Sequence, residues 1–465
     1  MTDTAYDTVV LGGGMAGLAA AERSLEAGRR VVLIEAAPTV GGLARAITVG
    51  GEPIEPYYHH IFPQDHETRE LIDRLGMTER LEWRKAPMAV MDHGRALPFD
   101  SPLDVLRFRA LSLPQRLRLA FGSAYQLVRR DRRRMDTTPV GVDGPRWFGK
   151  GAYRKLWQPL LRAKFGDAAD DIAMAWLVAR IRQRAGGRKA GGDKLGYLRG
   201  SLGTLATAYA QDIEARGVEM RTGTRALRLE RTEEGWIVHT EKDGVPTDIQ
   251  ATSVIACLSG PILSRLVELP PAYKAVIDAI DYRGIVCALL ELDRPLSGFY
   301  WTNVTDRLGL GCVGIIEHTN FIPAERYGGR SLLYLAHYVD RSGPTWTATP
   351  EELIGAVEPA LRALNPAFEP SWIVNVHLNR DPFAQPVPLA GGPMPRLRFD
   401  TGLPGLVHAS LAHVYPDDRG VSKALGLGRR AADYALASTT PAADAAPASA
   451  SASGLNDAAA PTSSR

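Results

Sequence analysis

The feature that most constrains the fold is a glycine pattern near the N-terminus, where Gly12, Gly14 and Gly17 spell GxGxxG. A short apolar run, 7–11, precedes the glycines and a stretch of helix formers, 15–27, follows them. In such a βαβ unit the first glycine permits a tight turn, the second lets the backbone approach a pyrophosphate, and the third allows close packing of helix on strand. The opening of the chain therefore predicts a Rossmann-type nucleotide site.

The second strand of this unit ends in an acidic residue. Gly28 ends the helical stretch, the apolar run 31–34 follows, and Glu35 comes next. A carboxylate in this place accepts hydrogen bonds from ribose hydroxyls and disfavours a 2′-phosphate. The diphosphate is expected on free N–H groups at the helix N-terminus, at the backbone of Met15 and Ala16.

A second copy of the glycine pattern acts as an internal control. Gly309, Gly311 and Gly314 also spell GxGxxG, but the strand-like run 315–320 follows them, without an acid-tipped second strand. We interpret this copy as a hairpin or bulge. A second domain that binds NAD(P)H is therefore not expected.

The segment after Glu35 distinguishes between dinucleotides. It contains the pair Gly41 and Gly42, followed by Arg45. Here the chain resembles the flavin amine oxidase superfamily, in particular its protoporphyrinogen-oxidase-like branch, which is related to UDP-galactopyranose mutase and carotenoid desaturases. The resemblance extends to about Leu436 and includes the segments 57–62, 157–166 and 195–200. It implies FAD as cofactor, with a diphosphate reached by the loop that carries Ala36, Gly42, Leu43 and Arg45.

The resemblance also assigns two later segments to the cofactor. The backbone around Ala226 is expected to contact adenine, and the C-terminal segment 406–432 is expected to close over the ribityl chain and the flavin. The Gly-Asp pair usual in the family is replaced here by Ser410 and Leu411. The recognisable part is 415–421, with Asp418 and Val421 as the candidate contacts.

Two neighbouring histidines are the candidates for catalysis. His59 and His60 lie among tyrosines and a phenylalanine. Adjacent side chains of an extended segment face opposite sides, so the pair is unsuited to binding one metal ion. Either the rings pack among the aromatic residues, or one lies beside the isoalloxazine as proton acceptor or substrate contact. No metal site is predicted, and the chemistry is expected from the cofactor.

Composition excludes several classes of protein. The 465 residues carry a net charge of only +3, which argues against a nucleic-acid partner. The cysteines, Cys257, Cys287 and Cys312, lack metal-type spacing and are expected to be buried, reduced thiols. The N-terminus does not resemble a signal peptide, and no apolar run reaches the roughly 20 residues that span a bilayer. A cytoplasmic protein is expected.

The segment 112–135 combines an apolar stripe with a cluster of arginines. Ser112 is a potential helix cap, and apolar residues recur after it at helical spacing. Three interpretations stay open: a helix in a membrane interface, a core-packed helix with a solvated basic end, and a clamp for an anionic substrate. The arginines are Arg116, Arg118, Arg129, Arg130, Arg132, Arg133 and Arg134.

Together these patterns predict an α/β fold with a Rossmann-type FAD-binding domain and an inserted α+β substrate domain. The function expected is an FAD-dependent oxidoreductase that dehydrogenates an apolar, amine-bearing, or lipid- or sugar-linked small molecule. The alternatives are a non-oxidative flavin enzyme of the mutase type and a flavin-binding redox scaffold. We assign 1–95, 195–275 and 385–437 to the FAD domain, 96–194 and 276–384 to the substrate domain, and 438–465 to a disordered tail.

Overall fold

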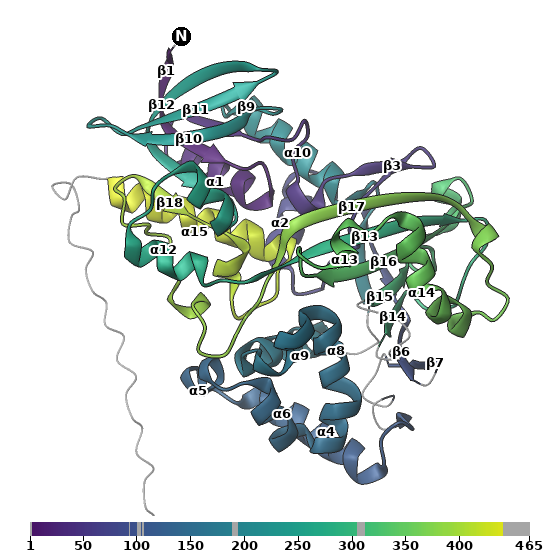
Figure 1. The fold of residues 1–465 in the computed structure, drawn as a ribbon. Coiled ribbons are helices and arrows are strands. Elements are labelled where there is room, and N and C mark those ends of the chain that lie inside the picture. The colour runs from purple at the N-terminus through teal and green to yellow at the C-terminus, as the bar shows by residue number, and fades with distance from the viewer. Residues whose placement is uncertain are drawn as a thin grey trace, which may run out of the picture.

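The computed structural model describes residues 2–92, 94–99, 104, 107–187, 194–304 and 312–439. Two seven-stranded sheets lie above a group of helices in Figure 1. The chain's last described helix, α15 (Val421–Thr439), includes the first two residues of the predicted tail. The rest of that tail lies outside the described residues.

The first sheet carries the predicted βαβ unit, so the α/β prediction is confirmed. Five of its strands are parallel, in the order β18-β12-β1-β2-β9. A hairpin of β10 and β11 adds antiparallel pairing to the first part of β12. The strand bounds are β1 (Thr2–Leu11), β2 (Val31–Ile34), β9 (Glu219–Arg221), β10 (Arg225–Arg231), β11 (Trp236–Lys242), β12 (Val245–Ala256) and β18 (Leu406–His408).

Alternating side chains of these strands serve two cores. Val10 and Leu33 pack with α1 (Met15–Glu26), α10 (Ser201–Ala215) and α15 on one face of the sheet. Val9 and Leu11 pack on the other face with Trp236, under α11 (Gly260–Leu266) and α12 (Pro271–Asp278). The continuous apolar runs seen in the sequence are thus explained by burial on both faces.

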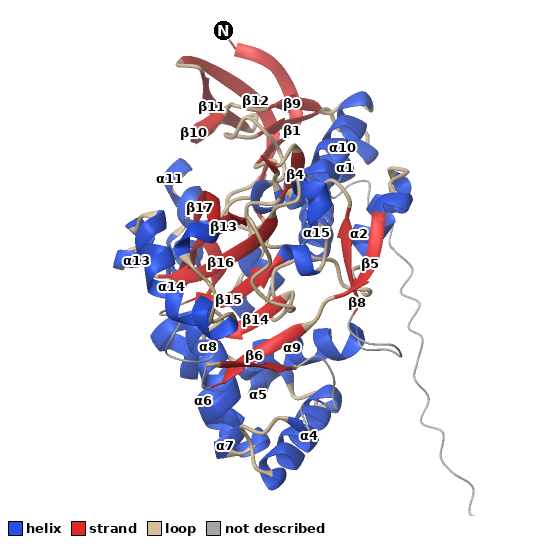
Figure 2. Cartoon of the chain, turned by 90° about the vertical axis from the view of Figure 1, so that its right-hand side faces the viewer, coloured by secondary structure: helices blue, strands red, loops and turns tan. Residues whose placement is uncertain are grey.

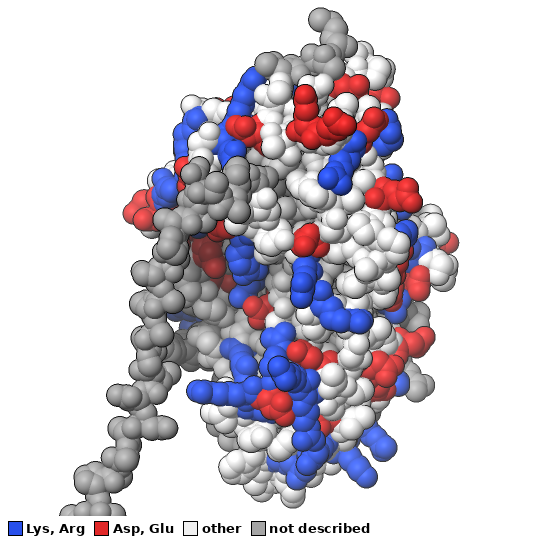
Figure 3. Space-filling view, turned by 90° about the vertical axis from the view of Figure 1, so that its left-hand side faces the viewer, with Lys and Arg blue, Asp and Glu red and all other residues white. Residues whose placement is uncertain are grey.

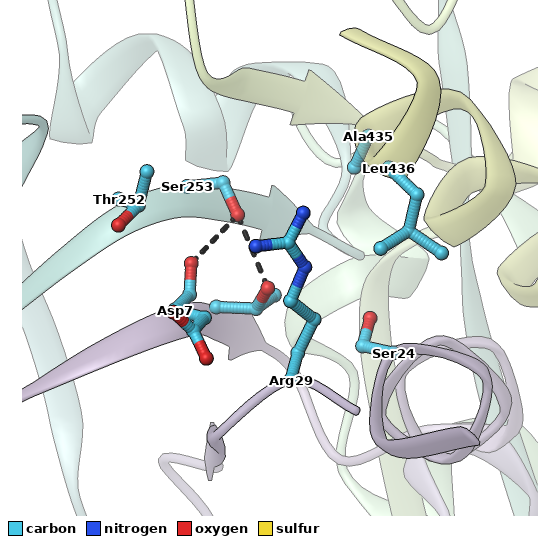
Figure 4. Close-up of a pocket in the computed structure, with 8 residues that line it drawn as sticks. Asp7, Ser24, Arg29, Thr252, Ser253, Ala435 and Leu436 are labelled. Carbon is cyan, nitrogen blue, oxygen red and sulfur yellow. Dashed lines mark hydrogen bonds between the residues drawn. The ribbon is translucent and has the colours of Figure 1, made fainter. Parts of the chain in front are cut away.

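Side-chain hydrogen bonds also join β1 to β12, as Figure 4 shows. The Ser253 hydroxyl donates to the Asp7 carbonyl at 3.0 Å and lies 3.1 Å from the Thr8 hydroxyl. These residues line a crevice of about 10 Å³, which is room for about one water molecule. The crevice is a packing gap at the end of the sheet, too small for a ligand.

The second sheet is built mainly from the middle of the chain. Its order is β17-β13-β16-β15-β14-β6-β7, and α14 (Pro350–Leu364) covers one face. The predicted FAD domain reaches residue 95, yet β6 hydrogen-bonds into this second sheet. The bounds are β6 (Met88–Asp92), β7 (Arg95–Pro98), β13 (Tyr282–Leu292), β14 (Trp301–Val304), β15 (Cys312–Glu317), β16 (Ser331–Val339) and β17 (Ile373–Pro386).

The second glycine pattern falls partly on this sheet. Gly309 and Gly311 lie outside the described residues. Gly314 lies within β15, which is antiparallel to both β14 and β16. In its described part, this pattern is therefore strand and not a turn into a helix.

The helical part of the molecule lies at the bottom of Figures 1 and 2. Its core contains Phe148, Leu156, Phe165 and Trp176. The predicted helix over 112–135 is two helices, α4 and α5, separated by residues 129–131. The bounds are α4 (Leu113–Val128), α5 (Arg132–Thr137), α6 (Val140–Phe148), α7 (Lys150–Ala152), α8 (Gln158–Phe165) and α9 (Met174–Gly187).

The orientation of α4 corrects one interpretation of its sequence. Ser112 caps the helix, with a capping box completed by Gln115. The residues buried against the rest of the protein are Leu119, Gly122 and Gln126. The stripe that would fill the core of a core-packed helix is instead exposed, so that interpretation is wrong. The exposed residues are Leu113, Leu117, Phe121, Tyr125, Leu127 and Val128.

A glycine explains this orientation. A Cβ atom at Gly122 would lie 2.4 Å from the Trp147 carbonyl oxygen of α6. The backbones of α4 and α6 can approach this closely only where the side chain is absent. The face that carries Gly122 therefore turns inward, and the bulky apolar face turns outward.

Replacing Gly17 by alanine should destabilise the first sheet. A Cβ atom there would lie 1.8 Å from the Gly12 carbonyl oxygen, and overpacking of this kind typically costs about 1–3 kcal/mol. We expect a lower melting temperature and lower flavin content. The control is Gly355→Ala in α14, where a Cβ meets no atom within 4 Å and should be neutral or stabilising. Equal melting temperatures for the two variants would contradict the packing role of Gly17.

Candidate flavin site

The first glycine turn brings the start of α1 to the carboxyl end of the parallel strands. Gly12 has a φ of +100°, a conformation that side chains other than glycine's rarely adopt. Its Cβ would also lie 2.9 Å from the Cys257 carbonyl oxygen, at the end of β12. Gly14 directly precedes α1. The first turn of α1 contains no acidic residue that would compete for the free N–H groups of the helix. The end of the helix is thus suited to an anion.

Glu35 holds this turn from the neighbouring strand. Its carboxylate accepts the Gly13 N–H at 2.6 Å and the Ala37 N–H at 2.7 Å. The Glu35 backbone N–H donates to the Arg221 carbonyl on β9 at 3.0 Å. The predicted ribose acid therefore lies directly beside the glycine turn, and its oxygens keep lone pairs for a further donor.

The pair Gly41 and Gly42 contacts the first glycine turn. The Gly41 N–H donates to the Gly13 carbonyl at 2.8 Å. Gly41 and Gly42 have φ values of +110° and +57°, and a Cβ at Gly42 would come within 3.3 Å of the Gly14 Cα. Arg45 follows, donating to the Gly42 carbonyl at 3.3 Å. Two glycine loops thus form one wall made largely of backbone.

A cavity of about 1050 Å³ opens from this wall into the space between the two sheets and the helices. Ligand pockets commonly measure roughly 300–1000 Å³, so this one has room for more than a single small ligand. The predicted residues that line it are Gly12, Gly14, Met15, Ala16, Glu35, Gly42, Leu43, Arg45, His59, His60, Asp418 and Val421.

Three predicted cofactor residues are not part of this lining. Gly17 packs against Gly12, as its role in helix–strand packing requires. Ala36 directly follows Glu35 and is exposed. Ala226 lies on β10, paired with Thr240 of β11 and half-buried. Cys257 corrects the expectation of three buried thiols, since it is half-buried and faces the cavity.

The two predicted histidines lie on the cavity wall in their neutral form. The His59 Nδ1 lies 2.7 Å from the Tyr57 carbonyl, and the His60 Nδ1 lies 3.3 Å from the Tyr300 hydroxyl. Burial lowers the pKa of His59 to about 4 and that of His60 to about 3. Rings with such low pKa values are weak bases, which disfavours the role of proton acceptor and leaves that of a contact.

Aromatic side chains form another part of the cavity wall, which we call the aromatic wall. Tyr58 packs edge-on against Trp301 at 4.8 Å between ring centroids, and its hydroxyl lies 3.1 Å from that of Tyr338. His60 packs edge-on against Phe62 at 4.8 Å. These rings come from the segment after β4 (Glu52–Ile54) and from strands β14 and β16 of the second sheet.

A charged cluster lies within the cavity lining. Lys164 of α8 donates to Asp418 Oδ2 at 2.7 Å, and Arg180 of α9 lies 3.4 Å from the same oxygen. Arg419 hydrogen-bonds the Tyr338 hydroxyl. Burial lowers the pKa of Lys164 to about 8, although Asp418 opposes this shift. Burial would raise the pKa of Asp418, but the surrounding cations hold it well below its usual range.

Asp418 was a sequence-predicted contact, but its cationic partners were missed. The available signal was the segment Lys164-Phe165-Gly166, which matched the family without an assigned role. Arg180 carried no such signal. Its helix meets α8 and the C-terminal segment only in the folded chain.

Comparison with known proteins agrees with this geometry. Residues 15–436 match the model of the flavin-containing amine oxidoreductases. The chain belongs to this family. Its matches to curated relatives span less than half of each relative's length. A putrescine oxidase from Kocuria rosea is 39% identical over 79 residues, which are 17% of this chain and 16% of that enzyme. A 15-cis-phytoene desaturase from Solanum lycopersicum is 22% identical over 250 residues, 49% of this chain and 42% of the desaturase.

Solved structures share the fold of this flavoenzyme across almost its whole length. A putative protoporphyrinogen oxidase from Exiguobacterium sp. 255-15 has a TM-score of 0.73 at 19% identity, over 94% of this chain and 100% of that one. A UDP-galactopyranose mutase has a TM-score of 0.72 at 16% identity, over 94% of this chain and 96% of the mutase chain. The predicted relationship to these proteins is confirmed, and at such identities it concerns the fold.

The lining of the flavoenzyme's cavity fits FAD, its cofactor. The start of α1 and the glycine loops offer backbone N–H groups suited to a diphosphate. Among the described residues, Asp418 Oδ1 and the Ser259 hydroxyl are buried without a hydrogen-bond partner. Both residues line the cavity. A ligand that brings hydroxyl and ring N–H donors would satisfy them.

Replacing Gly14 by valine should abolish FAD binding in the flavoenzyme without unfolding it. A Cβ at Gly14 meets only the Gly42 Cα, at 4.0 Å, and would project into the cavity. We expect the variant to purify colourless with the circular dichroism of the native apoprotein. Flavin content, measured by absorbance after heat release, tests this. A yellow variant would show that the diphosphate lies elsewhere.

Replacing Glu35 by alanine should weaken FAD binding. The variant loses a charge-assisted acceptor, and hydrogen bonds to charged groups typically contribute about 1.5–3 kcal/mol. The measurement is the dissociation constant of FAD for reconstituted apoprotein. Glu233→Ala, at an exposed turn before β11, is the control and should bind FAD normally.

Proposed function

We propose that this flavoenzyme dehydrogenates an apolar small molecule held between the glycine loops and the aromatic wall. The observation that supports this most directly is the single cavity that runs from the predicted diphosphate site to Tyr58, Trp301 and Tyr338. FAD would be held by the glycine loops, Glu35, Arg45 and the segment that carries Asp418 and Val421. The remaining space would accept the substrate.

The charges that line the cavity are nearly balanced once FAD is bound. The acidic lining residues are Glu35, Asp65, Asp381 and Asp418, and the basic ones are Arg45, Lys164, Arg180, Arg184, Arg419 and Lys423. The diphosphate of FAD would add two negative charges and offset the excess of basic residues, so net charge does not decide between an amine and a neutral substrate. The aromatic wall supports an apolar substrate.

The chemistry divides between cofactor and protein. Bound flavin supplies the acceptor for two electrons, taken as hydride from a substrate C–H bond. The aromatic wall would orient the substrate and exclude water, which strengthens electrostatic interactions inside the cavity. The pair of Lys164 and Asp418 would place an ion pair in the cavity lining, beside the bound molecules. His59 and His60 would contact the substrate or the flavin as neutral rings.

Anaerobic reduction tests the proposed reaction. Purified holoenzyme is mixed without oxygen with apolar molecules that carry an oxidisable C–H bond next to a double bond or heteroatom. A substrate should bleach the flavin absorbance near 450 nm, and an added electron acceptor should restore it. A panel of cationic amines that reduces the flavin faster than neutral analogues of similar size would contradict the proposed substrate class.

A second candidate is a non-oxidative flavin reaction of the mutase type. The basic residues Lys164, Arg180 and Arg184 in the lining favour it, because a nucleotide-linked sugar is anionic. The fold shared with UDP-galactopyranose mutase agrees with it. The two reactions differ in net redox change: a mutase would isomerise its substrate without consuming an acceptor. Binding of FAD with neither flavin reduction nor isomerisation would favour the third alternative, a redox scaffold.

The pH dependence of kcat/KM should reflect the protonation of Lys164. With a pKa lowered to about 8, this side chain is charged at neutral pH and loses its proton as the pH rises through 8. We therefore expect kcat/KM to fall above about pH 8. Lys164→Arg keeps the charge and should move this alkaline limb upward, whereas Lys164→Met should lower kcat/KM at all pH values. If kcat/KM of Lys164→Arg fell at the same pH as that of the native enzyme, the group that titrates would not be Lys164.

A further inference from the structure

The helix α4 presents a continuous apolar face to solvent. Three of its members, Leu113, Phe121 and Val128, are 60%, 74% and 70% exposed. The positions recur at helical spacing, so that they lie on one side of the helix. We call this surface the α4 face. It consists of Leu113, Leu117, Ala120, Phe121, Ala124, Tyr125, Leu127 and Val128.

Positive charge is concentrated in the chain segment that contains the α4 face. Residues 112–155 contain eleven lysines and arginines and three aspartates, in a chain whose net charge is only +3. Figure 3 shows basic side chains gathered over the lower, helical part of the molecule. The exposed members on and near α5 are Arg130, Arg132, Arg133 and Arg134.

Two arginines of this segment have structural roles. Arg129 is 6% exposed and pairs with the buried Asp143 at 3.0 Å. Arg132 pairs with Asp136 at 2.8 Å and lies over the Tyr415 ring. The cluster thus separates into Arg129 and Arg132, which pair with aspartates, and the exposed Arg130, Arg133 and Arg134.

The α4 face continues into the cavity. Ala120, Ala124 and Leu127 line the cavity as well as the exposed side of the helix, together with Leu119 and Ser123. An apolar molecule that arrives along α4 would therefore reach the cavity without crossing open water.

We propose that the α4 face docks on an anionic lipid bilayer. The apolar side chains insert at the boundary of headgroups and acyl chains, and Arg130, Arg133 and Arg134 bind the headgroup phosphates. Such docking needs no spanning helix, and among the described residues none is long and apolar enough to cross a bilayer. Docking on the bilayer is independent of the reaction proposed above. Delivery of substrate from the bilayer to the cavity rests on the proposed function.

The charge distribution favours a bilayer over a second copy of the chain. A self-complementary dimer through the α4 face would bring two sets of exposed arginines together, and like charges repel. An anionic surface instead meets both the apolar residues and the arginines around them. Exposed apolar surface of this extent commonly marks an interaction site.

Co-sedimentation of holoenzyme with vesicles tests the apolar residues. The vesicles contain either phosphatidylcholine alone or phosphatidylcholine with phosphatidylglycerol, and we expect binding to the second kind. Replacing Leu117, Phe121 and Val128 by glutamine should weaken binding by at least about tenfold. The matched control replaces three exposed apolar residues elsewhere, Leu227, Val245 and Val374, by glutamine and should bind as the native chain does.

The same assay tests the arginines. Replacing Arg130, Arg133 and Arg134 by glutamine should weaken binding on the order of 100-fold at low salt, and high salt should weaken native binding similarly. The matched control replaces the exposed Arg231, Arg265 and Arg396 by glutamine and should keep native affinity. Flavin content and melting temperature identify any variant that is misfolded.

Three results would overturn the proposal. Native holoenzyme could fail to sediment with anionic vesicles, or the controls could lose binding as strongly as the α4 and arginine variants. Alternatively, the native chain could be a dimer that the glutamine variant of Leu117, Phe121 and Val128 converts to monomer, without vesicle binding by either. Flavin reduction by a soluble substrate is measured without lipid, so failure of the proposed reaction would be seen separately.

Discussion

The contact between Gly17 and the Gly12 carbonyl determines where the rest of the site can form. It allows α1 to lie directly on β1, with its first turn at the carboxyl end of the parallel strands. Glu35 then reaches the Gly13 N–H, and Gly41 reaches the Gly13 carbonyl. Any side chain at Gly17 would push the helix outward and separate these partners. The cavity depends on this one close approach.

The parts of the site that were predictable are those fixed by short stretches of sequence. The glycine turn, Glu35 and the pair Gly41 and Gly42 are constrained by backbone conformation and close approach, and both leave a pattern in the sequence. The pairing of Asp418 with Lys164 and Arg180 leaves none, because these cations come from a different part of the chain. Tertiary packing alone brings these three together.

The helix α4 shows a different limit of sequence patterns. Its periodicity correctly predicts an amphipathic helix after Ser112. Periodicity does not determine, however, which face of the helix packs against the protein. The face that packs inward carries Gly122 and Gln126. Close approach to Trp147 at Gly122 decided the orientation. In this helix the packed face is marked by the small residue opposite the bulky stripe and not by hydrophobicity.

The order of strands in the first sheet affects when this sheet can form during synthesis. Thr8 of β1 pairs with Ser253, and Val254 of β12 pairs with Leu406 of β18. The central strand β1 can pair early with β2, but its other neighbour, β12, emerges only with the second half of the chain, and β18 emerges near the end. Apolar strands with unpaired edges are prone to aggregate in this interval. The yield of this protein should therefore depend on chaperones that cover these edges during synthesis.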